Sequence, residues 1–516
     1  MNNTAAAVTP VTGITKFMLV TSAVIGSSVF EFAWTIAGVA LPHMQGAFSA
    51  TPDQIAWIMT AFVLGTAVAI PCVGWLSDRF GRKRVFAASI FGFTLTLVMC
   101  ATSTTLLDSA FWRFMQGALG AAIIPLGQAI TVDAYPPDQQ GKATAIWGNG
   151  VVLGGIMGPV IGGVVVEHLS WQWIYWLNVP IGIIALAGVL IYIPEIESEP
   201  DRPMDWFGFI LITSGLAVLQ IMLNRGERLD WFESPEIILE CLYAVFALYL
   251  FVAHSWTAKN PFFRPQLFHN RNFVLGQAFT LVNGAVAILP LVLLPLLLQN
   301  VAGYPAISAG GLIVFRGLGL VLGLTLIGQV TDRVDARHIL FLGLLLTGVS
   351  GWAMSTWTVE ISTWDVIWTN MLQGIGSGIV YVQITSLTFS TLSPRLRTEG
   401  FAVYHTMLFL GAAMGVAGIL FVHTRSAQTS HAILTEFVNP FREVFRFATT
   451  PEQWDISTLD GMAAIQDELI RQSQMIAYNN TFFTVAAMCF LAAPFVYLFR
   501  RSVNRDLSSR PESAAV

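Results

Sequence analysis

The chain has 516 residues, of which 55% are hydrophobic and only 11% are charged, against about 25% charged residues in soluble domains. Apolar residues are spread along the whole chain, whose mean hydropathy is +0.66, so the composition excludes a soluble globular protein. The formal net charge of −5 is small and gives no indication of nucleic acid as a partner.

Apolar stretches long enough to cross a bilayer as helices recur along the chain. The sequence predicts fourteen spans, at 16–41, 54–75, 84–102, 107–130, 142–166, 172–193, 206–223, 236–256, 273–298, 308–329, 338–357, 364–391, 400–423 and 477–499. Most lysine and arginine residues of the loops fall on one side, whereas the short loops of the other side hold only Arg225 and Arg228. Because positively charged loops stay in the cytoplasm, both termini are predicted to be cytoplasmic.

One outer segment, 424–476, separates the last two predicted spans and is polar, with an acidic, glutamine-containing run from Glu452 to Gln474. It is long enough to form small helices of its own. Two interpretations remain open for it: a surface that rises from the membrane to dock another protein, or a solvated loop without a specific use.

Two motifs indicate an internal repeat. A polar turn in the first half returns with an offset of 254 residues, and its matching positions are Gly74, Asp78 and Arg79 in the first copy and Gly328, Asp332 and Arg333 in the second. A second motif returns with an offset of 257 residues, as Gln116-Gly117 and Gln373-Gly374. Such a repeat predicts two six-helix halves with two inserted helices between them, an arrangement typical of alternating-access carriers with a site at the membrane midplane.

The predicted domains follow from this repeat. They are an N-terminal half (1–193), a linker with the two extra helices (194–272), a C-terminal half that includes the outer segment (273–499), and a cytoplasmic tail (500–516).

Three local motifs carry a resemblance to a known family. They are the turn that begins Gly74-Trp75-Leu76, Arg113 followed by Gln116-Gly117 and Gly120, and the glycine-rich run Gly154-Gly155-Ile156-Met157-Gly158-Pro159-Val160-Ile161-Gly162-Gly163 in span 5. With them the chain resembles the major facilitator superfamily, in particular the fourteen-helix drug–proton antiporters of the EmrB branch of the EmrB/QacA family. The resemblance covers essentially the whole chain.

The resemblance implies an all-α polytopic membrane protein of the inner (plasma) membrane that exports hydrophobic or amphipathic compounds in exchange for protons. It also implies a tripartite pump with a periplasmic adaptor and an outer-membrane channel. A dedicated carrier for one metabolite or siderophore is the main alternative, and a membrane-embedded enzyme or receptor is an alternative from another class. The sequence has no Walker glycine–lysine loop, so we expect the proton gradient to drive transport without ATP, cofactor, metal or enzymatic chemistry.

The first turn is predicted to control a conformational gate. Gly81 permits a tight turn, and Asp78 and Arg82 have the spacing of an i, i+4 ion pair. By analogy with the family, Asp78 would lie against the start of span 13, and Asp332 and Arg333 would form a weaker copy of the gate. The alternative is a loop that only sets the topology.

In span 5, the resemblance implies a leak-proof hinge, although helix packing alone explains much of the pattern. The residues of this predicted hinge are Gly154, Gly158, Pro159, Gly162 and Gly163.

Charged residues inside spans cost at least about 2.5–3.5 kcal/mol and therefore indicate function. Glu31 lies on a polar stripe of span 1, and we predict that it carries the proton. The family's acidic position in this span is occupied here by Ala33, so the prediction rests on the stripe alone. Arg113 is expected to modulate this protonation, as the resemblance implies, and Arg316 stands alone in span 10. The alternative for each of these residues is a structural ion pair or hydrogen bond.

Amide and aromatic side chains in the spans suit a cavity for amphipathic molecules. The predicted cavity wall consists of Trp34, Gln116, Gln277, Asn283, Arg316, Asn370, Gln373 and Tyr381. Asp133 and Asp365 lie near span ends and are predicted to be interfacial.

Overall fold

A computed structural model describes residues 13–136, 139–195, 203–330, 334–438, 454 and 458–500. Within these ranges every regular element is a helix, which confirms the predicted all-α class. Asp332, Arg333, the tail after residue 500 and the centre of the outer segment lie outside the described residues, so the predictions made for them remain predictions.

The N-terminal half runs from α1 to α9. Its second span is interrupted by the short helix Ile70–Cys72, because Pro71 offers no backbone N–H to a continuous helix. Its helices are α1 (Gly13–Ala47), α2 (Pro52–Ala69), α3 (Val73–Phe80), α4 (Arg82–Thr102), α5 (Leu106–Gly120), α6 (Ile123–Asp133), α7 (Gln140–His168), α8 (Trp173–Trp176) and α9 (Asn178–Tyr192).

The inserted pair and the C-terminal half follow. The inserted helices are α10 (Trp206–Arg225) and α11 (Pro235–Thr257), and the short α12 (Gln266–His269) leads into the C-terminal half. This half consists of α13 (Arg271–Leu296) with the π-helical turn Leu297–Val301, α14 (Ala306–Val330), α15 (Ala336–Met354), α16 (Thr363–Phe389), α17 (Arg397–Phe437) and α19 (Leu459–Ala492), which ends in the 3-10 turn Ala493–Leu498.

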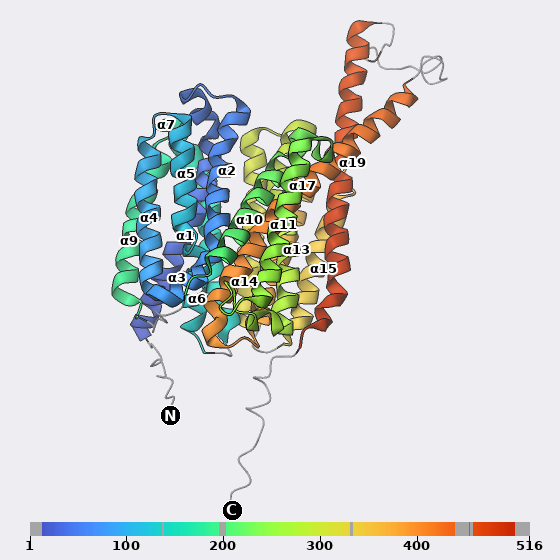
Figure 1. Ribbon diagram of the computed structural model, residues 1–516. Helices are drawn as coiled ribbons and strands as arrows, with labels where there is room; N and C mark the ends of the chain where they lie inside the picture. The colour runs from blue at the N-terminus through green and yellow to red at the C-terminus, as the bar shows by residue number, and fades with distance from the viewer. Residues whose placement is uncertain are drawn as a thin grey trace, which may run out of the picture.

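Among the described residues, thirteen helical segments are long and apolar enough to cross a membrane. The predicted span 364–391 is the other long helix, α16, and its polar residues, such as Asn370 and Gln373, lower its hydropathy. Since α16 packs against α14 and α15 inside the bundle, it occupies the place of the twelfth predicted span. The described chain starts and ends at the same end of the bundle (Figure 1), here called the predicted cytoplasmic end.

The internal repeat is visible in the helix contacts. A Cβ at Gly65 of α2 would clash with the carbonyl oxygen of Phe114 in α5, and a Cβ at Gly319 of α14 would clash with that of Met371 in α16. Gly319 lies 254 residues after Gly65, and Met371 lies 257 residues after Phe114, which are the offsets of the two sequence motifs. Glycine at the matching positions therefore permits the same close helix pair in both halves.

The inserted helices are tied to both halves. α10 packs against α11, against α2 of the N-terminal half and against α17 of the C-terminal half. At the predicted cytoplasmic end, the carboxylate of Asp205 caps α10 through the backbone N–H of Gly208 and lies 2.9 Å from Nε2 of His254. The same carboxylate accepts a hydrogen bond from the backbone N–H of Phe262. Asp205 therefore fixes the chain that leads from the inserted pair to the C-terminal half.

The last two long helices leave the bundle at the end opposite to the termini (Figure 1). α17 has 41 residues and α19 has 34, or about 60 Å and 50 Å at 1.5 Å per residue, compared with about 30 Å for the hydrocarbon core. The described parts of the outer segment are thus continuations of the spans rather than separate small helices. A hydrogen bond of 2.9 Å between His423 and Gln474 joins the two helices.

Candidate transport site

The polar turn between α3 and α4 differs from the prediction in one ion pair. Gly81 has φ of +87°, which glycine adopts without strain, so α3 ends at Phe80 and α4 starts at Arg82. Asp78 and Arg82 therefore lie on different helices and do not form the predicted i, i+4 pair. Instead, Nη1 of Arg82 lies 2.6 Å from Oδ2 of Asp133 at the end of α6.

Asp133 also connects the two halves. Its other carboxylate oxygen lies 2.9 Å from Nη1 of Arg397, the first residue of α17. One carboxylate of the N-terminal half is thus shared by an arginine from each half. Asp133 is more than the interfacial residue predicted from sequence, because it bridges the halves.

A second bridge involves Asp78 and the inserted segment. The guanidinium of Arg264 lies 2.9 Å from Oδ2 of Asp78, and the backbone N–H of Arg264 donates to Oε1 of Glu399 in α17. Gly74 packs directly on Glu399, whose Cα would lie 3.0 Å from a Cβ at this glycine. The predicted approach of the turn to span 13 is therefore present in the structure, and Arg264 takes part in it.

A layer of buried side chains lies next to these bridges. Nε2 of His405 in α17 is 2.7 Å from Oε1 of Gln128 in α6, and the hydroxyl of Tyr381 in α16 donates to the same oxygen at 3.4 Å. Trp147 of α7 stacks on Tyr381 with ring centroids 6.4 Å apart and donates its indole N–H to Ser27 of α1. The halves are in close contact here, so the predicted cytoplasmic side of the bundle is closed.

The glycine-rich run of span 5 faces α1. A Cβ at Gly154 would lie 2.6 Å from the carbonyl oxygen of Ser28, and a Cβ at Gly158 or Gly162 would overlap with side chains of α1. Gly163 has no atom within 4 Å of a Cβ, so it does not belong to this contact. The run therefore lets α7 and α1 approach closely, and the predicted hinge, with Pro159 inside α7, is placed beside the helix that carries Glu31.

Glu31 is half-buried and lies against this glycine run, with its Cγ 3.3 Å from the position of a Cβ at Gly155. Among the described residues, its carboxylate has no hydrogen bond or ion pair. A carboxylate without a partner inside a membrane helix is costly when ionised. Glu31 is therefore suited to bind a proton or a positively polarised group of a substrate.

Arg113 is fully buried in α5, with 0% of its surface exposed. Its Nη1 donates to Gln116 at 2.6 Å, and its guanidinium lies 4.5 Å from the ring centroid of Phe62. Phe62 in turn stacks on Trp34, with centroids 5.3 Å apart. No described carboxylate pairs with Arg113, and the aromatic pair connects it to the polar stripe of α1 that contains Glu31.

Arg316 of α14 is half-buried and donates to the backbone carbonyl of Ala287 in α13. Its Nε has no hydrogen-bond partner among the described residues, and the same holds for both amide atoms of Gln277 and for Oε1 of Gln373. Buried polar groups normally have partners, so these atoms are available to water or to a ligand. Asn370 donates its amide N–H to the carbonyl of Val366 in its own helix, and its Oδ1 likewise has no partner among the described residues.

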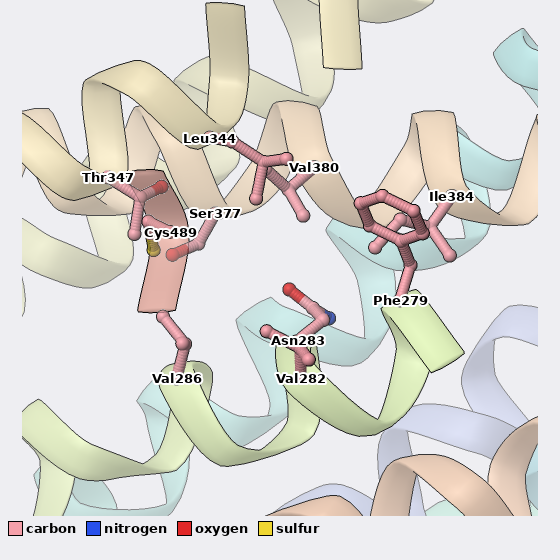
Figure 2. Close-up of a pocket in the computed structure, with 10 residues that line it drawn as sticks. All are labelled: Phe279, Val282, Asn283, Val286, Leu344, Thr347, Ser377, Val380, Ile384 and Cys489. Carbon is pink, nitrogen blue, oxygen red and sulfur yellow. The ribbon is translucent and has the colours of Figure 1, made fainter. Parts of the chain in front are cut away.

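Asn283 points into a small cavity inside the C-terminal half (Figure 2). The cavity has room for about one water molecule, and it is lined by Phe279, Val282, Asn283, Val286, Leu344, Thr347, Ser377, Val380, Ile384 and Cys489. All of these residues belong to α13, α15, α16 and α19. The cavity is too small for an amphipathic substrate and does not lie between the halves.

Sequence reasoning missed Gln128, Trp147, Arg264 and His405. Gln128 and His405 are polar residues inside predicted spans, a signal that could have identified them. Arg264 was counted only as a positive charge of a cytoplasmic loop. Its position between two acidic side chains depends on the fold and has no local sequence signal.

Three features of the described residues define a membrane transporter: thirteen candidate spans together with the long helix α16, the internal repeat, and the ion pairs between the halves. The sequence profile of the Major Facilitator Superfamily matches residues 23–416, and the chain belongs to this superfamily.

Its relatives include proteins named for drug export and fatty acid resistance. The chain is 30% identical to the multidrug export protein EmrB of Haemophilus influenzae, over 97% of this chain and 99% of that protein. It is 29% identical to the fatty acid resistance protein FarB of Neisseria gonorrhoeae, over 90% of this chain and 92% of that protein. Among solved structures, the proton:xylose symporter XylE aligns with a TM-score of 0.62 at 11% identity, over 94% of this chain and 96% of that one.

Proposed function

We propose that this protein is a proton-coupled antiporter that exports a range of hydrophobic or amphipathic compounds. The observation that carries the proposal is the half-buried carboxylate of Glu31, which has no partner among the described residues and lies beside the close α1–α7 contact. The names of the relatives EmrB and FarB support export of amphipathic molecules. A site that binds either a proton or a substrate, but not both, couples their movements in opposite directions.

In the proposed cycle, the two halves alternate between an outward-facing and a cytoplasm-facing arrangement. The bridges at Asp133 and Arg264 hold the cytoplasmic side closed, so the described conformation would expose Glu31 to protons from outside. Protonation removes the charge of Glu31 and lowers the cost of burying it. The halves then reorient, and a substrate from the cytoplasm or the inner leaflet displaces the proton.

Arg113 and Arg316 have separate proposed roles. Arg113 packs on Phe62, which stacks on Trp34 of the α1 stripe, and we assign to it the modulation of Glu31 protonation. Arg316 lies in the other half, where its backbone touches Gly374 beside Gln373 of α16, and provides polar contacts for the substrate. Both arginines lack a carboxylate partner among the described residues, which is why we assign them to binding rather than to structural ion pairs.

We further propose that the protein resides in the inner membrane of a two-membrane envelope, with both termini cytoplasmic, and is the inner-membrane component of a tripartite pump. The projecting parts of α17 and α19 support this, because they extend well beyond the bundle (Figure 1) and expose apolar side chains outside the predicted membrane region. These side chains include Ile433, Phe437, Leu459 and Met462. A periplasmic adaptor that leads to an outer-membrane channel would bind there.

Proteoliposomes with an imposed pH gradient test the transport proposal. Wild type is expected to accumulate several lipophilic compounds against their gradients, and Glu31→Gln is expected to lose this accumulation at least tenfold. The matched control is Glu167→Gln, which changes an exposed acid near the end of α7. Transport of a single compound by wild type would favour a dedicated carrier, and gradient-driven transport retained in Glu31→Gln would exclude Glu31 as the proton carrier.

A further inference from the structure

His405 is a buried titratable residue in the contact between the two halves, and the proposed proton site does not use it. It lies in α17 with 1% of its surface exposed. Among the described residues, its one hydrogen bond crosses from the C-terminal half to the N-terminal half, over 2.7 Å to Oε1 of Gln128. The protonation state of this imidazole is therefore coupled to the contact between the halves.

The hydrogen-bond pattern assigns the proton on the ring. Oε1 of Gln128 is a carbonyl oxygen, which only accepts, and the hydroxyl of Tyr381 also points to it. In the neutral ring, Nε2 of His405 then donates to this oxygen, and Nδ1 carries the lone pair. Nδ1 is buried and has no hydrogen-bond partner among the described residues.

Among the described residues, no charged side chain contacts the imidazole ring of His405. Trp147 of α7 and Tyr404 of α17 pack on the ring at centroid distances of 6.1 Å and 5.3 Å. Titratable and charged groups on the helices packed around it include Tyr381 of α16, Arg397, Glu399 and Tyr404 of α17, Asp133 of α6, Lys142 of α7 and Glu31 of α1. Asp133 and Lys142 each lie five residues from the contacting Gln128 or Trp147, about 7.5 Å along the helix axis, and Glu399 lies six residues before His405.

We propose that His405 is a proton-sensitive latch, whose neutral imidazole holds the cytoplasmic side closed and whose protonated form opens it. An imidazolium donates from both nitrogens, so closure would bury a charged N–H without an acceptor, which is strongly unfavourable. When the halves separate, water reaches the ring, and exposed histidine titrates near pH 6.5. Protons therefore favour the conformation that is open to the cytoplasm.

The latch would act as a brake on the transport cycle. An antiporter brings protons into the cell, and protonation of His405 by an acidic cytoplasm would prevent the closure that the next cycle requires. The inference rests on the proposed alternation between two conformations, but it does not require Glu31 to carry the transported proton. Export would thus slow when the cytoplasm is already acidic.

Distances between spin labels on the two halves test the latch directly. Arg84→Cys at the start of α4 and Ser393→Cys after α16 place labels on exposed positions at the predicted cytoplasmic end, in a chain whose four native cysteines are replaced. Between pH 7.5 and 5.5 the ratio of closed to open molecules is expected to fall about tenfold, as follows from a group that titrates near pH 6.5 only in the open form. When His405→Gln is added to Glu31→Gln, so that the proposed proton site no longer titrates, this ratio should change less than twofold.

Two further variants separate the possible causes. Gln128→Glu places a carboxylate next to His405. This carboxylate should pair with the imidazolium and keep the protein closed at pH 5.5. If His405→Gln fails to fold, Gln128→Glu provides the test. Glu31→Gln should keep the pH dependence of the distance even though it loses transport. An unchanged pH dependence in His405→Gln or in Gln128→Glu would overturn the latch. A pH dependence lost only in Glu31→Gln would also overturn it, while supporting the proposed proton site.

Discussion

The charged residues at the predicted cytoplasmic end and those in the middle of the helices have different surroundings. At the cytoplasmic end, Asp133 and Arg264 each contact oppositely charged residues, and these contacts join the two halves. In the middle, Glu31, Arg113 and Arg316 have no oppositely charged partner among the described residues. Paired charges stabilise one conformation, whereas an unpaired buried charge remains available to a proton or a ligand. The comparison separates residues that hold the closed state from residues that bind.

The largest effect is expected where the two regions are linked, at the α1–α7 contact. Gly154→Ala places a methyl group against the backbone of Ser28, beside the helix that carries Glu31, and overpacking of this kind costs about 1–3 kcal/mol. Thermal unfolding in detergent should show lower stability, and transport should fall. Gly163→Ala is the matched control in the same helix, because a Cβ there meets no atom within 4 Å. Equal losses in both variants would contradict the assignment of the glycine run to this contact.

The next largest effect is expected for Asp133→Asn, which removes the carboxylate shared by Arg82 and Arg397. Since the side chains are partly solvated, the two ion pairs together should contribute about 1–2 kcal/mol to the closed state. The label pair at positions 84 and 393 should report a roughly fivefold to thirtyfold shift toward open molecules at pH 7.5. Asp365→Asn is the control, because the described partners of Asp365 are its neighbours around the start of α16. A distance distribution that does not change would exclude Asp133 as a bridge.

A smaller shift in the same direction is expected for Arg264→Ala, of about 1 kcal/mol. Arg264→Lys should recover part of it, because an ammonium keeps the charge but loses the planar, multiple-donor geometry. The exposed Arg271→Ala tests whether any loss of positive charge has this effect. The shifts of Arg264→Ala and Asp133→Asn should add, since the two bridges share no residue; strong non-additivity would mean that they form one network.

The smallest effect is expected for Phe62→Leu, which removes the ring between Arg113 and Trp34. The lost cation–π contact is worth about 0.5–1 kcal/mol, so the pH dependence of transport should shift while folding is preserved. Phe93→Leu makes the same truncation at a neighbouring ring that contacts Phe62 but not the guanidinium. If the two variants have the same pH profile, Phe62 does not position Arg113 for its role in proton binding.

Much of the fold was predictable because membrane spans need long apolar stretches and because the repeat left copies of its motifs. Glycine positions also carried information, since Gly65 and Gly319 have to stay small where helices touch. The contacts of the site were less predictable. The prediction of an Asp78–Arg82 ion pair was wrong because Gly81 separates the two helices. The bridge of Arg264 was not predictable because it joins residues that are distant in sequence. The direction in which Asn283 points depends on the rotation of α13, which the weak periodicity of an almost entirely apolar helix does not determine.

The central claim is that a proton and a substrate compete for Glu31. Proton release on substrate binding tests it without membranes or gradients: a substrate identified in the transport assay is added to purified protein in weakly buffered detergent solution, and the pH change is recorded. Wild type should release protons in proportion to the bound substrate, whereas Glu31→Gln should bind the substrate and release none. Equal proton release by both proteins would contradict the account and would place the transported proton on another group.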